Sequence, residues 1–307
     1  MINKDKIIRF IKNPYIAIAR LINKRECRLL PDRLYIQIKY RAAFGRPVNW
    51  KEPVTFNEKL QWLKLYDRNP FYSELVDKFE VKNIVARKIG QQYVIPTLGV
   101  WDSFNDIPFD DLPEQFVLKC THDSGGLVIV KSKKDLDMEM AKNKISSSLK
   151  RNFYWLSREW PYKAVKPRVI AEQYVEVPGG DLKDYKFFCF GGEPKYLFVA
   201  SDRNKPGKDV KFEYFDIDFN RLNLRQSVHE NSNYNIERPT HYEEMIEIAR
   251  KLSKGFPQLR VDLYEANGQV YFGELTFFHH GGFVPFIPEY WDFEWGNSIV
   301  LPEKRAK

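Results

Sequence analysis

Two short motifs near the carboxyl-terminal end of the chain have the residue types of a metal site. They are Arg260-Val-Asp262 and Glu274-Leu-Thr276, on two apolar runs joined by a turn at Asn267-Gly268. Because side chains alternate along a strand, pairing the two runs could bring two carboxylates and a hydroxyl together. Such oxygen ligands, with phosphate oxygens and water, bind magnesium. Taken alone, the pattern is more typical of a solvated hairpin with outward charges.

A glycine-containing loop offers a phosphate-binding element. Thr121-His-Asp-Ser-Gly-Gly126 lies between two strand-like runs, and Lys119 ends the first of them. Backbone N–H groups that no side chain obstructs can close over phosphate oxygens, and Lys119 can supply a cation. By itself this signal is weak, because many surface hairpins carry a Gly-Gly turn. The chain has no G-x-x-x-x-G-K-[ST] motif and no G-x-G-x-x-G after a strand, which argues against a P-loop or a Rossmann site.

Two strand ends in the middle of the chain carry polar groups. Glu172-Gln-Tyr-Val175 ends one expected strand and Asp184-Tyr-Lys186 begins another. Such positions can present a backbone edge to a purine and polar groups to a ribose or phosphate. The same residues are also compatible with ordinary strand ends.

His279 and His280 suggest a zinc site or acid–base chemistry, but no further ligands accompany them. Neighbouring residues on an extended segment point apart, so with Gly281 and Gly282 they are better explained as a loop on the phosphate or acceptor side. One of the histidines would then assist proton transfer from an incoming amine. Arg203 follows an apolar strand and is a candidate contact for an acceptor carboxylate, with a free surface arginine as the simpler explanation.

The elements that position these groups follow from periodicity and capping signals. Helices are expected at residues 55–66, 74–90, 138–155 and 240–255, with capping boxes at Thr55/Glu58 and Thr240/Glu243. Hairpins with helices between them predict an α+β fold. Strands are expected at residues 94–100, 115–119, 127–131, 169–177, 185–190, 195–200, 259–264 and 270–276.

Composition and charge limit the class of protein. The 307 residues carry a net charge of +8, and residues 1–41 hold all of it, with eleven basic and three acidic side chains. This basic, apolar segment is expected to form short helices on the protein body, or to lie on an anionic membrane surface. No basic stripe continues beyond it, so nucleic-acid binding is not expected.

The cysteines and the apolar runs point to the cytoplasm. Cys27, Cys120 and Cys189 have no C-x-x-C spacing and are expected to be reduced thiols, with Cys120 and Cys189 buried. No apolar run reaches the roughly 18 to 20 residues of a spanning helix. A cytoplasmic protein, with peripheral contact at the inner membrane face, is therefore expected.

The order of the motifs resembles that of the ATP-grasp superfamily, and within it the TupA-like ATP-grasp family of polysaccharide gene clusters. The resemblance covers roughly residues 35–302. It is carried by Asp77-Lys78, Ile95-Pro-Thr97, Phe116-Val-Leu-Lys119, the glycine loop, Ala171-Glu-Gln-Tyr-Val175, Asp184-Tyr-Lys186, Arg260-Val-Asp262, Glu274-Leu-Thr276, the stretch from Thr276 to Phe286 around His279-His-Gly-Gly282, Trp291-Asp292 and Gly296.

This resemblance implies two α+β subdomains that clamp ATP, residues 55–172 with the lid loop and residues 173–307 with the metal site, after a basic, mainly helical region at 1–54. The residues it implies at the phosphates are Lys78, Lys119, Thr121, Ser124, Gly125 and Gly126. Those at adenine and ribose are Glu172, Gln173, Tyr174, Val175, Asp184 and Lys186. Asp262 and Glu274 would bind Mg²⁺, with Thr276 where many relatives have Asn. Arg260 and Lys186 would act in catalysis.

The implied function is an ATP- and Mg²⁺-dependent carboxylate–amine ligase that works through an acyl phosphate. Its expected setting is capsular or exopolysaccharide or teichuronopeptide synthesis, with a uronic acid or peptide carboxylate of a glycan precursor as acceptor. The alternative is a nucleotide-sugar-dependent glycosyltransferase that uses Asp216 and Asp218 as a D-x-D motif. A non-catalytic nucleotide-binding protein is the third hypothesis.

Overall fold

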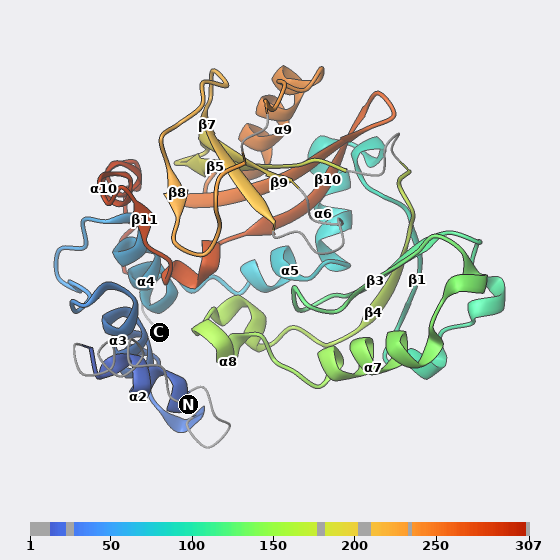
Figure 1. The fold of residues 1–307 in the computed structure, drawn as a ribbon, viewed down its shortest axis with the longest axis horizontal. Coiled ribbons are helices and arrows are strands. Elements are labelled where there is room, and N and C mark those ends of the chain that lie inside the picture. The colour runs from blue at the N-terminus through green and yellow to red at the C-terminus, as the bar shows by residue number, and fades with distance from the viewer. Residues whose placement is uncertain (1–12, 23–27, 177–181, 202–209, 233–234, 305–307) are drawn as a thin grey trace.

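The computed structural model describes residues 13–22, 28–176, 182–201, 210–232 and 235–304. Two antiparallel sheets with helices around them make up the fold, as Figure 1 shows, which confirms the predicted α+β class. The four-stranded sheet has the order β1-β4-β2-β3, the five-stranded sheet β10-β9-β5-β6-β7, and β11 pairs with β8. Strand bounds are β1 Thr97–Trp101, β2 Phe116–Cys120, β3 Leu127–Val130, β4 Val169–Gln173, β5 Asp184–Phe190, β6 Glu193–Ser201, β7 Lys211–Asp216, β8 Arg225–Gln226, β9 Gln258–Ala266, β10 Gln269–Thr276 and β11 Phe286–Ile287.

Helices pack against the five-stranded sheet and against one side of the four-stranded sheet. Among the 3₁₀ segments, His279–Gly282 matters most for the site. The α-helices are α2 Tyr15–Leu21, α3 Asp32–Phe44, α4 Phe56–Tyr66, α5 Tyr72–Val76, α6 Glu80–Ile89, α7 Met138–Leu149, α8 Tyr154–Ser157, α9 Tyr242–Ser253 and α10 Tyr290–Asn297.

The larger core belongs to the five-stranded sheet. Every residue of β5 is buried, and α9 packs Met245 and Ala249 against this sheet. Helices α4, α5 and α6 contribute to the same core, although they precede the four-stranded sheet in the chain. A division of the chain at residue 172 therefore stays a prediction. Burying one large apolar side chain contributes about 1.5–3 kcal/mol, so this sheet is a rigid base for polar groups on its strands.

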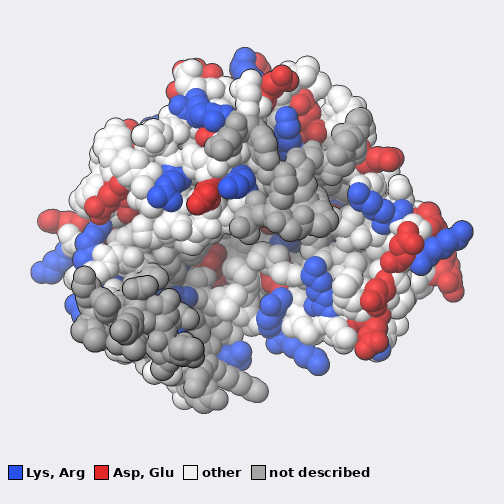
Figure 2. Space-filling view, viewed as in Figure 1, with Lys and Arg blue, Asp and Glu red and all other residues white. Residues whose placement is uncertain are grey.

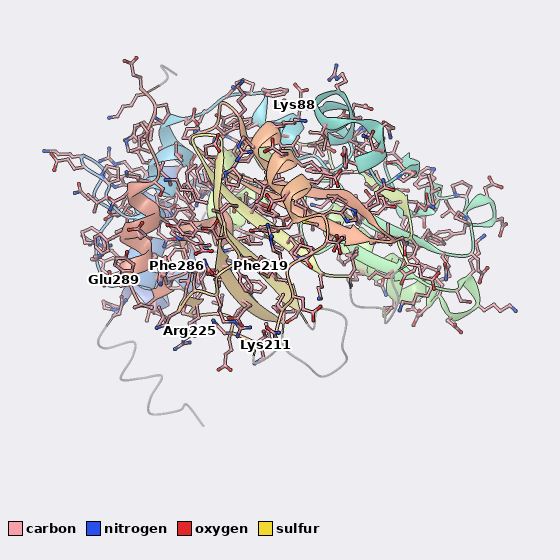
Figure 3. All side chains as sticks on the ribbon, turned by 90° about the horizontal axis from the view of Figure 1, so that it is seen from above. Lys88, Lys211, Phe219, Arg225, Phe286 and Glu289 are labelled. Carbon is pink, nitrogen blue, oxygen red and sulfur yellow. The ribbon has the colours of Figure 1, made fainter. Side chains whose placement is uncertain are left out.

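A smaller core lies under the four-stranded sheet, where α7 places Ala141 and Ile145 against Phe116 and Leu118 of β2. The short strands β8 and β11 carry Arg225 and Phe286, labelled in Figure 3. Phe286 is buried against Trp295 of α10, with ring centroids 4.9 Å apart. This contact ties α10 to the larger core.

Two of the predicted helices are each interrupted. The helix expected at 74–90 is split into α5 and α6, because the Asp77 carboxylate accepts hydrogen bonds from the backbone N–H groups of Phe79, at 2.8 Å, and Glu80. Lys78 thus lies in a connection and not on a helix. The helix expected at 138–155 ends at Leu149, and α8 begins at Tyr154, whose N–H donates to the Asn152 side chain.

Of the two predicted capping boxes, only one forms. The Thr55 hydroxyl accepts from the N–H of Glu58, and the Glu58 carboxylate accepts from the N–H of Thr55, which confirms the first. At α9 the residue before the helix is His241, with no side-chain cap. Its N–H donates to Glu265 at 2.8 Å, so a contact from β9 replaces the predicted box at Thr240.

The cysteines, the basic start of the chain and the length of the helices can be compared with the predictions. Cys120 and Cys189 are buried as predicted, and burial raises the pKa of the Cys120 thiol to about 11. Cys27 lies outside the described residues, and of the basic start residues 13–22 and 28–41 are described, which include α2 and most of α3. In the described ranges, no helix is both long and apolar enough to cross a bilayer.

Candidate functional site

Two adjoining cavities lie between the four-stranded and five-stranded sheets. The larger one, of about 650 Å³, is lined by apolar side chains of β2 and β3 and by Gln173, Tyr174, Val175 and Tyr264. The smaller one, of about 130 Å³, is polar. Lys119 and Glu172 line both cavities, and so the apolar space opens directly onto the polar one. The residues of the smaller cavity that bear charge are Lys78, Lys82, Lys119, Asp123, Glu172, Asp184, Lys186 and Glu274.

Glu172 is the point at which the two cavities meet. Its carboxylate pairs with Lys82 at 2.6 Å and with Lys119. Burial opposes ionisation of this group, but the charges of Lys119 and Lys82 outweigh burial and lower the pKa of Glu172. The sequence analysis missed Lys82 of α6, because its pairing with Glu172 of β4 depends on tertiary packing, which local sequence patterns do not show.

The glycine loop is held by its own aspartate. The Asp123 carboxylate accepts hydrogen bonds from the N–H groups of Gly125 at 3.2 Å and Gly126 at 3.0 Å. Arg151 donates to the other oxygen at 3.0 Å, and the Ser148 hydroxyl donates to the same oxygen. A Cβ on Gly126 would lie 2.5 Å from the Cys120 sulfur, so the loop needs glycine there.

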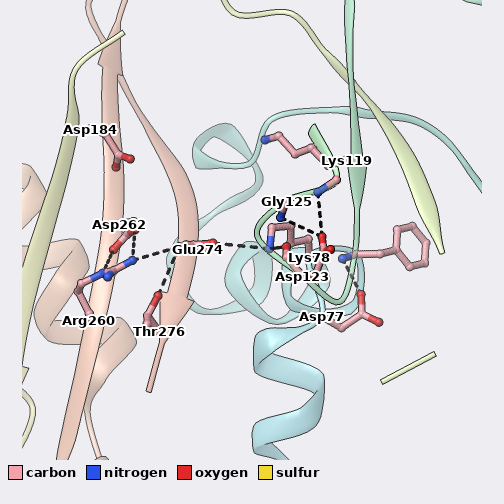
Figure 4. Close-up of polar contacts among 12 residues, drawn as sticks. Asp77, Lys78, Lys119, Asp123, Gly125, Asp184, Arg260, Asp262, Glu274 and Thr276 are labelled. Carbon is pink, nitrogen blue, oxygen red and sulfur yellow. Dashed lines mark hydrogen bonds and ion pairs between the residues drawn. The ribbon is translucent and has the colours of Figure 1, made fainter. Parts of the chain in front are cut away.

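The predicted members of this loop have different surroundings. Ser124 and Gly126 line the polar cavity, whereas Thr121 is fully buried with its hydroxyl donating to the Lys166 carbonyl. The Lys78 ammonium donates to the Asp123 carbonyl at 2.8 Å and lies 3.6 Å from Glu274. Figure 4 shows this bridge from the loop to the five-stranded sheet.

Strands β9 and β10 bring the two acidic motifs together. A register shift between Phe272 and Glu274 places Glu274 opposite Asp262 and Thr276 opposite Arg260. A Cβ on Gly273, at the shift, would lie 3.0 Å from the Asp262 carbonyl. Glycine therefore permits the close backbone approach that aligns the two carboxylates.

Asp262 is fully buried and paired with cations on both oxygens. Arg260 donates to them at 2.6 and 2.7 Å, and Lys186 donates to one of them. Lys186 also pairs with Asp184 at 2.6 Å, and Arg260 donates to Glu274 at 3.1 Å. Burial alone would lower the pKa of Arg260, but the neighbouring Asp262 and Glu274 charges raise it.

The oxygen donors predicted for magnesium lie near one another, and of the three Glu274 lines the polar cavity. Asp262 and Glu274 lie opposite each other, and the Thr276 hydroxyl is 3.4 Å from Glu274. Within the described ranges, no group of three or more His, Cys, Asp and Glu side chains is placed to hold a metal. Magnesium usually keeps several waters and binds one or two carboxylates together with substrate phosphates, and this donor set fits that pattern.

His279 was expected in a loop on the phosphate or acceptor side, but its side chain is buried. Arg260 donates to its Nδ1 at 2.8 Å, so Nε2 carries the proton and donates to Gln226 at 2.7 Å. Gln226 also accepts from the Tyr214 hydroxyl at 2.8 Å. Burial, with the His280 ring and the Arg260 charge, lowers the pKa of His279 well below its usual value. This neutral, buried imidazole holds Arg260 in position.

The segment around His280 is not extended, which corrects the sequence analysis. His280 has φ 48° and Gly281 φ 61° within the 3₁₀ helix, and the His279 and His280 rings lie 4.2 Å apart. The carbonyls of Gly281 and Gly282 accept from Gln61 of α4 at 3.1 and 2.6 Å. Among the described residues that line the apolar and polar cavities, none comes from 279–282, and Arg203 lies outside the described residues.

The D-x-D motif forms a turn. The Asp216 carboxylate accepts from the N–H groups of Asp218 at 3.0 Å and Asn220 at 2.8 Å, and from the Asn220 side chain. It therefore stabilises the exit from β7, as Asp commonly does at turns.

Comparison with known proteins identifies the family. A profile described as TupA-like ATPgrasp matches residues 58–300, so the chain belongs to the TupA-like ATP-grasp family. The resemblance seen in the sequence is thereby confirmed. No curated protein matches the chain significantly.

Solved structures show weaker similarity. D-alanine–D-alanine ligase from Bacillus anthracis, complexed with ATP, is 16% identical with a TM-score of 0.37, over 66% of this chain and 53% of that chain. The enzyme of the same name from Helicobacter pylori is 15% identical with a TM-score of 0.43, over 80% and 69%. L-amino acid ligase from Bacillus licheniformis is 11% identical with a TM-score of 0.43, over 82% and 55%. The chain thus spans about half the length of the first and third of these proteins.

Proposed function

We propose that this protein is an ATP- and magnesium-dependent ligase that joins a carboxylate to an amine through an acyl phosphate. The observation that carries the proposal is the polar cavity, where Lys78, Lys119 and Lys186 surround the same space as Glu274. Four lysines, Lys82 included, and four acidic side chains line this space; the lysines suit the phosphate oxygens of a nucleoside triphosphate, and the acidic groups suit its magnesium ion. Membership in an ATP-grasp family supports the same ligand.

The base of the nucleotide would occupy the larger, apolar cavity. Tyr174 and Val175 line it just beyond the last residue of β4, where the backbone leaves the sheet. A purine would pack on Val117 and Leu127 and take backbone hydrogen bonds along residues 173–175. Asp184 and Lys186 lie on β5 at the polar cavity, next to the expected ribose and phosphates.

The proposed reaction has two steps. An acceptor carboxylate oxygen attacks the terminal phosphorus of ATP, the bond to the bridging oxygen breaks, and ADP leaves. The amine nitrogen then attacks the acyl carbon, phosphate leaves with the C–O bonding electrons, and nitrogen loses a proton. Bound magnesium would supply charge neutralisation on the phosphate oxygens.

The chain's own side chains would stabilise the transferred group and exclude water. Lys78, Lys119 and Lys186 neutralise phosphate charge, and Arg260, fixed by Asp262 and His279, stabilises charge on the transferring group. The loop of residues 121–126 would act as a lid over the reactive acyl phosphate. Neutral His279 has both ring nitrogens in hydrogen bonds, and so we assign it no proton transfer.

The acceptor and setting are proposals that follow from the family resemblance. We place the enzyme in capsular or exopolysaccharide or teichuronopeptide synthesis, at the inner membrane face, with a uronic acid or peptide carboxylate as acceptor. The basic residues 1–41 would bind anionic lipid. Sedimentation of the full chain with anionic liposomes, lost on deletion of residues 1–30, would support this docking, and unchanged sedimentation would contradict it.

Hydroxylamine trapping tests the reaction class. Enzyme, Mg-ATP and a panel of uronic acids and amino acids should give hydroxamate with matching ADP. Asp262→Asn and Glu274→Gln should each lower the rate roughly 10²-fold, because the first weakens the hold on Arg260 and Lys186 and the second removes a carboxylate from the polar cavity. Asp216→Asn and Asp218→Asn serve as matched controls and should retain the activity. Transfer from a nucleotide sugar, lost only in the Asp216 and Asp218 variants, would contradict the ligase proposal.

A further inference from the structure

A third cavity, of about 220 Å³, adjoins the polar cavity at the glycine loop. The two cavities share Asp123 and Ser124 of the loop as lining residues. We call this cavity the loop-side pocket. Its remaining walls come from Ile22 and Arg28 near the start of the described chain and from residues 150–158 around α8.

The loop-side pocket is strongly basic. Arg28, Lys150, Arg151 and Arg158 line it, and Asp123 is the one acidic side chain among its described lining residues. The Asp123 carboxylate already accepts hydrogen bonds from the loop amides. Figure 2 shows Lys and Arg side chains along the hollow beneath the middle of the molecule. Arg158 pairs with Asp32 at 3.8 Å and Arg151 with Asp123 at 3.0 Å, so the excess of positive charge that an anion would neutralise comes from Arg28 and Lys150.

Two of these cations are held in place by aromatic rings. The Arg158 guanidinium is buried, 4.6 Å from the centre of the Trp155 ring and 4.4 Å from that of Tyr35. The Arg28 guanidinium lies 5.3 Å from the Trp155 ring centre. Arginines stacked in this way are oriented before a ligand arrives, which favours paired hydrogen bonds to a carboxylate or phosphate.

The pocket is also linked to the loop. Arg151 lines the pocket and donates to Asp123, whose carboxylate holds Gly125 and Gly126. An anion in the pocket would share Arg151 with Asp123. The ligand would thus lie against Asp123 and Ser124, which also line the polar cavity with its lysines.

We propose that the loop-side pocket binds a second anionic group of the acceptor acid, a carboxylate or a phosphate, while the reacting carboxylate lies at the polar cavity. The inference rests on the proposed ligase function, and it defines the acceptor as an acid with at least two anionic groups. A simple monocarboxylic acid would place no charge in the pocket and would gain nothing from its cations.

Calorimetry on the full chain saturated with Mg-ADP tests the proposal by binding alone. The probes are a hexuronic acid with one anionic group, its 1-phosphate, and a hexaric acid with two carboxylates. We expect at least one doubly anionic probe to bind about tenfold more tightly than the hexuronic acid, or better. A preference for the 1-phosphate or for the hexaric acid identifies which anion the pocket selects.

Arg28→Gln should remove this preference, because it neutralises a cation of the pocket without touching the loop. Arg87→Gln, an exposed arginine on α6 outside the three cavities, is the matched control and should keep it. Equal affinity for all probes, binding of none of them, or an unchanged preference in Arg28→Gln would overturn the proposal.

Failure of the anion-pocket proposal can be distinguished from failure of the proposed ligase function. If binding depends on Arg28 but neither hydroxamate nor ADP forms, the proposed anion pocket is supported and the proposed ligase function is contradicted. If monocarboxylic acids give hydroxamate at a rate that Arg28→Gln does not change, the proposed ligase function is supported. The proposed binding of a second anionic group is then overturned.

Discussion

The Arg260 guanidinium donates a hydrogen bond of 2.8 Å to Nδ1 of His279, so the imidazole orients the arginine that faces both acidic residues. The opposite ring nitrogen is fixed by Gln226 at 2.7 Å. Because both nitrogens are engaged, the histidine acts through Arg260 and not on a substrate.

Replacing His279 should therefore impair turnover more than nucleotide binding. His279→Leu leaves Arg260 without this acceptor, and a displaced arginine should lower kcat roughly 10²-fold. The KM for ATP should stay within about twofold, because the phosphate-side lysines are untouched. Steady-state kinetics in the hydroxamate assay measures both quantities. Tyr214→Phe, which removes only the hydrogen bond to Gln226, is the milder control. An unchanged kcat in His279→Leu would contradict the positioning role.

The pH dependence of stability should reveal the lowered pKa of His280. Burial, with the Arg260 and His229 charges, lowers the pKa of His280 from 6.5 to about 3. Below pH 6.5 the unfolded chain takes up a proton that the folded protein does not, so stability falls as the pH falls. From pH 7 to pH 5 this histidine should account for about 2 kcal/mol of lost stability.

Urea unfolding of wild type and His280→Gln at the two pH values measures this contribution. The comparison uses the change between pH 7 and pH 5 within each protein, which removes any constant effect of the substitution. Parallel losses in the two proteins would show that His280 is protonated in the folded state.

The two loop glycines should differ in their tolerance of alanine. A Cβ on Gly126 meets the Cys120 sulfur and the Ser148 oxygen, each at 2.5 Å, whereas one on Gly125 meets only the end of the Arg151 side chain, at 2.8 Å. Gly126→Ala should therefore lower the free energy of unfolding by about 1–3 kcal/mol, and Gly125→Ala by less than about 0.5 kcal/mol. Denaturant titration of both variants checks the difference. Equal effects would contradict the tight packing around Gly126.

Local sequence rules predicted the acidic motifs but not their alignment. Alternation placed Arg260 with Asp262 and Glu274 with Thr276, and the hairpin formed as expected. Continuous pairing from the turn would have put Glu274 opposite Val261, on the other face. The register shift at Gly273 corrects this, and it depends on the close approach to Tyr264 and Asp262, which periodicity does not reveal.

Contacts between distant parts of the chain could not be predicted from local sequence patterns. Buried Lys64 donates to the carbonyls of Ser157 and Gly281, and so α4, α8 and the histidine segment are joined across more than 200 residues. Gln226 and its partner Tyr214 likewise gain their role only from tertiary packing. Asp77 ended a predicted helix because its side chain capped the next one, a choice that helical periodicity does not encode.

The most direct test of the central claim follows an oxygen atom. With an acceptor whose carboxylate is labelled with ¹⁸O, Mg-ATP and an amine, formation of an acyl phosphate transfers one labelled oxygen to the inorganic phosphate released. We predict one ¹⁸O atom per phosphate formed, with ADP in equal amount, and loss of both in Asp262→Asn. Unlabelled phosphate accompanying amide formation would contradict activation of the carboxylate by phosphorylation.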